Sequence, residues 1–217
     1  MKKDKYQKIY YIFFVLYLLI LGYAFFDNFT KGYTHSMMMT LVSGVLLFVL
    51  PLLFKVMKWK PIYEIYILWI IFITMASLLG SSYRFYDHVA YWDKYTHCFS
   101  GVLGSIAAYI LFCMMKKCRR VKKEDVSVMM VFVFAINISI ATLWELYEYA
   151  GLVFFNYDGI RHYATGVHDS MTDILVCIVG GIFVLLCIFH YYRTNKENFV
   201  INIYDKFYQR NIEKGAD

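Results

Sequence analysis

The feature that most constrains this chain is a set of six long runs without a charged residue, separated by short charged loops. A helix of about 20 residues crosses the hydrocarbon core of a bilayer, so an uncharged apolar run of about 18 residues is typical of a membrane span. The runs lie at 9–26, 36–54, 65–83, 98–115, 126–144 and 174–189. With the polar ends of the last three included, we expect those spans at about 95–115, 126–148 and 173–192.

Composition supports a membrane-embedded chain. Hydrophobic residues make up 60% of the sequence and charged residues only 18%, whereas an ordinary globular domain is about 45–50% apolar. This excess excludes a water-soluble enzyme. None of the runs alternates polar with apolar residues as a barrel strand would. We therefore predict an all-α, polytopic helix bundle of six transmembrane helices, a single membrane domain over 1–217 with a cytoplasmic tail at 193–217.

The charged loops predict which side of the membrane each end faces. The N-terminus, the loops at 55–64 and 116–125 and the C-terminal tail carry 18 of the 22 Lys and Arg residues. The opposite loops carry the other four, namely Lys31, Arg84, Lys94 and Arg161. Since positively charged loops stay inside, we expect both termini to be cytoplasmic. The basic residues are not gathered on one solvated face, so we expect no nucleic-acid partner.

The tail carries an amphipathic pattern of its own. Phe199, Ile203 and Phe207 recur at helical spacing, with polar residues around the rest of the helix. This pattern predicts a C-terminal amphipathic surface helix that lies against the inner leaflet. Because the apolar face is narrow and its partner could be lipid or protein, we expect the six-span core to fold after truncation following Arg193.

Ionisable residues gather at the outer ends of the last three spans. Charge inside a span is unfavourable by about 2.5–3.5 kcal/mol or more per residue, so such positions are functional candidates. They form three pairs at i, i+3 or i, i+4, and each spacing places both side chains on one helix face. The pairs are Asp93 with His97, Glu145 with Glu148, and Asp169 with Asp173.

Small residues continue the same faces deeper into the spans. Gly101 and Gly104 follow His97, and Cys177 and Gly180 follow Asp173. Small residues allow membrane helices to approach closely. We therefore predict that the fourth, fifth and sixth spans form one bundle, with the acidic pairs at its mouth and the first three spans beside it.

Three sequence blocks resemble a known family of bacterial inner-membrane proteins, the YjdF-like family. Its blocks are D-x-x-x-H-x-x-x-G, W-E-x-x-E and D-x-x-x-D-x-x-x-x-x-x-G-G, and the similar segments here are YWDKYTHCFSG (91–101), WELYEY (144–149) and HDSMTDILVCIVGG (168–181). That family is in turn similar to the VanZ-like proteins, named for teicoplanin resistance. The resemblance covers about residues 85–190. It implies a multi-pass protein of the bacterial cytoplasmic membrane, but no particular reaction. The positions that carry over are Asp93, His97, Gly101, Glu145, Glu148, Asp169 and Asp173.

Five carboxylates in one partly dehydrated mouth repel one another, and His97 offsets at most one of their charges when it is protonated. Either a cation or protons must therefore compensate. An oxygen-rich set with one imidazole favours a hard or borderline ion such as Mg²⁺, Mn²⁺, Ca²⁺ or Zn²⁺. The candidate ligands are Asp93, His97, Glu145, Glu148, Asp169 and Asp173.

Three functional interpretations are open from the sequence. The first is a metal-dependent hydrolase or transferase acting on a membrane lipid or a lipid-linked envelope intermediate, with Glu145 or Glu148 as catalytic base. The second is a non-catalytic membrane protein that binds a cation, a drug or a proton-coupled solute. The third is a hydrogen-bond network that only fixes helix packing. The sequence predicts no oligomeric state.

The topology is directly testable. Cysteines introduced at positions 30 and 160 should react with a membrane-impermeant maleimide in intact cells, because both positions fall in predicted outer loops. A cysteine at position 120, in the most basic loop, should react only after the cells are opened. Labelling at position 120 from outside would contradict the assignment.

Overall fold

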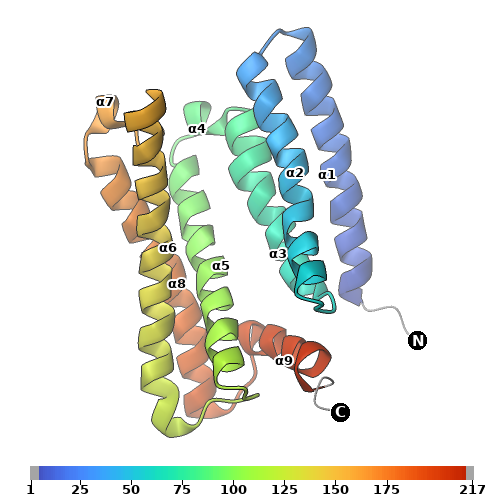
Figure 1. Ribbon diagram of the computed structural model, residues 1–217, viewed down its shortest axis with the longest axis vertical. Coiled ribbons are helices and arrows are strands. Elements are labelled where there is room, and N and C mark those ends of the chain that lie inside the picture. Colours follow the sequence, from blue (N-terminus) through green and yellow to red (C-terminus); the bar gives the residue numbers. More distant parts are fainter. Residues whose placement is uncertain (1–4, 214–217) are drawn as a thin grey trace. The chain divides into compact units, whose positions relative to one another are not determined.

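The computed structural model describes residues 5–213, and all regular structure in that range is helical (Figure 1). Six helical segments are long and apolar enough to cross a membrane, as the sequence predicts. Three of the basic residues counted on the predicted inner side lie outside the described residues, namely Lys2, Lys3 and Lys214. In chain order the elements are α1 (Lys5–Thr30), α2 (Thr34–Val56), α3 (Tyr63–Ile73), the π-helix η1 (Thr74–Ser82), α4 (Phe85–His88), α5 (Trp92–Met115), η2 (Lys123–Asp125), α6 (Val126–Phe155), α7 (His162–Thr165), α8 (His168–Thr194) and α9 (Phe199–Asn211).

The helices run past the residues at which the predicted spans end. Helix α6 continues from Glu148 to Phe155 and stops where Asn156 takes the left-handed conformation, with φ 53°. Helix α8 begins at His168, so that Asp169 lies in its first turn. Hydropathy marks the part of a helix in apolar surroundings, whereas the backbone stops at a cap that replaces the helical hydrogen bonds. The candidate acids therefore lie inside helices.

The chain forms two compact units. The first unit holds the chain up to Asp93 and again from Lys206, and the second unit is Lys94–Asp205. The boundary crosses the first turn of α5 and the middle of α9. Helices α5, α6 and α8 thus belong together almost entirely, which confirms the grouping of the last three spans predicted from their small residues.

Helices α1, α2 and the α3–η1 segment of the first unit pack through small polar side chains. Ser43 of α2 bonds Ser77 of η1 at 2.7 Å, and Thr40 of α2 bonds Ser82 of η1 at 2.5 Å. Asn28 of α1 donates to both Thr40 and Ser82 at 3.3 Å. In an α-helix, residues five apart would point about 140° away from each other. A π-helix repeats every i to i+5, so Ser77 and Ser82 both point toward α2. These two hydrogen bonds explain why the third span changes from an α-helix to a π-helix at Thr74.

In the second unit, α5 and α8 approach so closely that only glycine fits at two points. A Cβ on Gly101 would collide with the carbonyl oxygen of Cys177, and a Cβ on Gly180 would collide with that of Cys98. Asn137 of α6 joins them by donating from Nδ2 to the Gly101 carbonyl oxygen at 2.9 Å. Since lipid tails are as apolar as leucine, membrane helices associate through such close contact and interhelical hydrogen bonds.

Helix α9 is present as predicted, and two of the three residues on its apolar face are buried by protein. Ile203 and Phe207, two residues of the predicted lipid-facing side, are each 1% exposed. Phe199, the third, is 49% exposed. The sequence reveals an amphipathic face but not its partner, because lipid and protein both cover apolar side chains. Helix α9 therefore belongs to the packed protein, and we expect the rest of the chain to depend on it.

Polar contacts also hold α9, within each unit separately. In the second unit Arg120 donates to both carboxylate oxygens of Asp205 and, at 2.7 Å, to the hydroxyl of Tyr191. Burial lowers the pKa of the Arg120 guanidinium, but these hydrogen bonds outweigh it and raise the pKa above its ordinary value. The arginine therefore stays charged. In the first unit Lys206 forms an ion pair with Glu64.

The glycine contact can be tested with one substitution. Gly180→Val should lower the free energy of unfolding by about 3 kcal/mol, because the new side chain is forced against the backbone of α5. Gly22→Val in α1 is the matched control, since a Cβ there meets nothing within 4 Å. Its effect should stay below about 0.5 kcal/mol. Reversible unfolding in mixed detergent micelles measures both, and equal effects would argue against the close approach.

The role of α9 gives a second test. Asp205→Ala should destabilise the protein by about 3 kcal/mol, because it leaves the half-buried Arg120 without its carboxylate. Glu197→Ala, at an exposed position before α9, should change the melting temperature little. Truncation after Arg193 should lower both the melting temperature and the amount of protein in cells. A truncated protein that melts like the full chain would show that α9 is peripheral.

Candidate metal centre

Helices α5, α6 and α8 carry all the candidate ligands predicted from the sequence. On each helix the paired residues are one turn apart and share a face, as their spacing requires. The structure brings three of the six side chains to one place, sets Glu145 next to that group, and gives Asp169 and Glu148 other neighbours. Asp93 and His97 lie on α5, Glu145 and Glu148 on α6, and Asp169 and Asp173 on α8.

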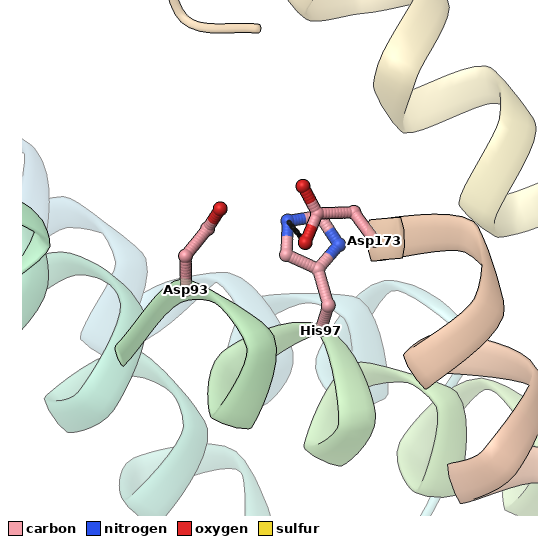
Figure 2. A group of neighbouring side chains, drawn as sticks. All are labelled: Asp93, His97 and Asp173. Atoms are coloured by element: carbon pink, nitrogen blue, oxygen red, sulfur yellow. Dashed lines mark ion pairs between the residues drawn. The ribbon is translucent and has the colours of Figure 1, made fainter. Parts of the chain in front are cut away.

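Asp93, His97 and Asp173 form the group that meets. One potential ligand atom from each of these residues lies within 4.8 Å of the others. Figure 2 shows Asp93 and His97 rising from successive turns of α5, with Asp173 projecting from α8 toward the imidazole. His97 is 9% exposed and Asp173 is 2% exposed. Two carboxylates and one imidazole make a donor set that suits Mn²⁺ or Zn²⁺, with coordination positions left for water or a substrate.

His97 lies between two carboxylates. Its Nδ1 is 4.0 Å from Oε1 of Glu145, and its Nε2 is 4.0 Å from Oδ1 of Asp173. Histidines that bind a metal through one ring nitrogen usually direct the other nitrogen to a carboxylate, which fixes the ring orientation. Glu145, only 7% exposed, lies beside the ring nitrogen of His97 that faces away from Asp173.

Close-packed protein lies directly below this group. One turn along α5 from His97 is Gly101, and one turn along α8 from Asp173 is Cys177, and these two residues are in backbone contact. The group therefore lies at the end of the α5–α8 contact. On α6, Glu145 ends a buried stripe with four-residue spacing that comprises Met129, Val133, Asn137, Ala141 and Glu145.

Lys94 is a residue of this site that the sequence analysis treated only as a topology signal. Its Nζ donates to Oδ1 of Asp169 at 2.7 Å and to Oδ1 of Asp173 at 2.8 Å. Arg161 adds a second positive charge, with its Nε 3.9 Å from Oδ2 of Asp169. The available signal was position, because Lys94 directly follows Asp93 at the level of the acidic pairs.

These two cations correct the electrostatic argument made from the sequence. From the sequence, His97 is the only residue expected to offset the charge of the carboxylates. Lys94 and Arg161 compensate Asp169, and Lys94 also compensates Asp173. An external cation is therefore not required to neutralise the whole cluster, and the case for a metal rests on the ligand geometry of Asp93, His97 and Asp173.

The remaining candidates have other surroundings. Glu148 is half-buried. Its side chain lies beside Gly159, in the segment after α6: a Cβ built on Gly159 would be 3.4 Å from the Cβ of Glu148. His168, next to Asp169, is exposed at the start of α8. Among the described residues, neither belongs to a group whose ligand atoms converge as those of Asp93, His97 and Asp173 do.

Comparisons with known proteins place the chain in a family. Neither the curated proteins nor the solved structures gave a match. A family model described as "Predicted membrane protein (DUF2238)" matches residues 9–195. This family is the one whose sequence blocks the last three spans resemble, and the match covers all six spans. The chain therefore belongs to the DUF2238 family of predicted membrane proteins.

Proposed function

We propose that this membrane protein binds a divalent cation and uses it to hydrolyse or transfer a group on a membrane lipid or a lipid-linked envelope intermediate. The observation that carries the proposal is the convergence of Asp93, His97 and Asp173 at one point between α5 and α8. The donor set fits a hard or borderline cation of the kind that catalyses such reactions.

The residues around the group have complementary roles in this proposal. A bound divalent cation would supply Lewis acidity, polarising a phosphoryl or carbonyl oxygen. Glu145 holds the ring of His97 in the orientation that presents its other nitrogen to the ligand group. Glu148, one turn further along α6, is the candidate general base that accepts a proton from the attacking water or hydroxyl.

The proposed substrate class follows from the proposed location. Under the predicted topology, the candidate ligands lie at the extracytoplasmic ends of α5, α6 and α8, within reach of outer-leaflet headgroups. A bacterial cytoplasmic membrane offers phospholipids and lipid-linked envelope intermediates at that level. A relationship to the VanZ-like proteins is also a proposal, which rests on the sequence blocks alone.

A non-catalytic cation- or solute-binding protein is the second candidate. The ion pairs of Lys94 with Asp169 and Asp173 favour it, because they show that the cluster can neutralise part of its charge without a metal. The two candidates differ at Glu148. Glu148→Gln should abolish turnover while leaving cation binding unchanged if the protein is an enzyme, whereas a pure binding protein would have no turnover to lose.

The metal proposal predicts graded effects in the purified protein. His97→Ala should weaken Mn²⁺ binding by about a hundredfold, because a ligand is lost. Glu145→Gln should weaken it by about tenfold, because the carboxylate only orients His97. Bound metal should raise the melting temperature, and chelator should reverse the shift. His168→Ala, at the exposed neighbouring histidine, should match the wild type.

Elemental analysis, Mn²⁺ titration followed by electron paramagnetic resonance, and melting curves with and without chelator decide the question. If wild-type protein carries no metal, binds none on titration and melts identically with chelator, the metal proposal is wrong. Lipid profiles of cells that express wild type or Glu148→Gln then test catalysis. A lipid change with wild type alone would support the enzyme, and identical profiles would support the binding protein.

A further inference from the structure

Lys94 ties α5 to α8 through a three-way contact at the candidate metal centre. Its Nζ donates to the side chains of Asp169 and Asp173 and, at 3.3 Å, to the backbone carbonyl oxygen of Asp169. The lysine side chain is 22% exposed, while those of Asp169 and Asp173 are 8% and 3% exposed. The ammonium is thus a mostly buried cation held by two carboxylates that are almost entirely buried.

One oxygen atom belongs both to this contact and to the candidate ligand group. Oδ1 of Asp173 accepts the hydrogen bond from Lys94 at 2.8 Å and is also the oxygen 4.0 Å from Nε2 of His97. A divalent ion held by His97 and Asp173 would therefore lie close to the lysine ammonium. Like charges at such short range repel strongly where water is largely excluded. The ion and the ammonium must compete for Asp173.

The side chains provide a route for the exchange. Lysine is a compact ammonium on a flexible four-carbon stem, so its charged end can move without a change in the backbone. Asp169 already accepts two hydrogen bonds from Lys94, through Oδ1 and through its backbone oxygen. Lys94 can therefore keep Asp169 as its partner after it has released Asp173.

We propose that Lys94 is the resident counter-ion of this site and that a divalent cation binds by displacing it from Asp173 onto Asp169. The inference rests on the proposed function, because it concerns the same ligand group. Lys94 then sets the affinity of the site. It neutralises the carboxylates when no ion is bound. It also weakens the binding of any ion that must displace it.

Removal of the lysine charge tests the proposal. Lys94→Met keeps a long apolar stem without the ammonium, and it should tighten Mn²⁺ binding by about tenfold or more. In chelator, the same variant should melt below wild type, because two buried carboxylates lose their partner. Saturating Mn²⁺ should restore most of that loss. Lys94→Arg keeps the charge and should not tighten binding.

Matched variants separate the local effect from general electrostatics. Arg84→Met removes another cation that is predicted to lie on the outer side. Arg84 pairs with Asp87, and both side chains are exposed, so this variant should leave Mn²⁺ affinity unchanged. Lys94→Met combined with Asp173→Asn should lose the gain in affinity, since the contested carboxylate is gone. Binding is measured by electron paramagnetic resonance of Mn²⁺ titrated into purified protein in detergent.

The outcomes distinguish this inference from the proposed function. If wild type binds Mn²⁺ and Lys94→Met binds equally or more weakly, the metal centre stands and the counter-ion role is wrong. If only Lys94→Met binds, the lysine excludes the metal from the natural protein, and both the metal centre and the displacement of Lys94 by a cation are wrong. If neither variant binds, both proposals are overturned. Tighter binding by Lys94→Met than by a binding-competent wild type supports both.

Discussion

The close approach of α5 and α8 at Gly101 and Gly180 is the constraint on which the second unit depends. In lipid, apolar side chains gain little by leaving one hydrocarbon environment for another, so helices associate where their backbones can touch. That contact fixes the rotation of both helices about their axes. His97 lies one turn from Gly101 and Asp173 one turn from Cys177, so the same contact sets the imidazole and the carboxylate opposite each other. The candidate site is a geometric consequence of helix packing.

Charge at this end of the unit is balanced locally. A buried carboxylate without a partner would be strongly destabilising, and Lys94 supplies a partner to two of them across the α5–α8 contact. The same lysine was counted from the sequence as one of the few basic residues on the outer side. A basic residue that departs from the predicted positive-inside pattern can thus be explained by its partners, because the ion pairs offset its charge.

The opposite end of the second unit is also balanced locally, but there a carboxylate lies among basic residues. The loop at 116–125 is a predicted topology signal, and Arg120 within it also binds both carboxylate oxygens of Asp205 on α9. In the same unit Ile203 of α9 is 1% exposed. A segment that looks like a membrane-surface helix is thus held by specific partners, and its contribution to stability should exceed that of a helix resting on lipid.

The sequence by itself determined the six spans and the grouping of the acids at one end of the last three spans, because hydropathy and helical spacing are one-dimensional properties. It also identified Gly101 and Gly180 as contact positions, since small residues at one-turn spacing have few other uses in a membrane. Only the tertiary structure decided which acids meet. Asp173 meets both His97 and Lys94, whereas Asp169 meets Lys94, a partner 75 residues away. Such pairings depend on the rotation of packed helices and the direction of each side chain. The same holds for the partner of α9 and for the π-helical turn that directs Ser77 and Ser82 to α2, because no local pattern specifies the surface across which an element packs.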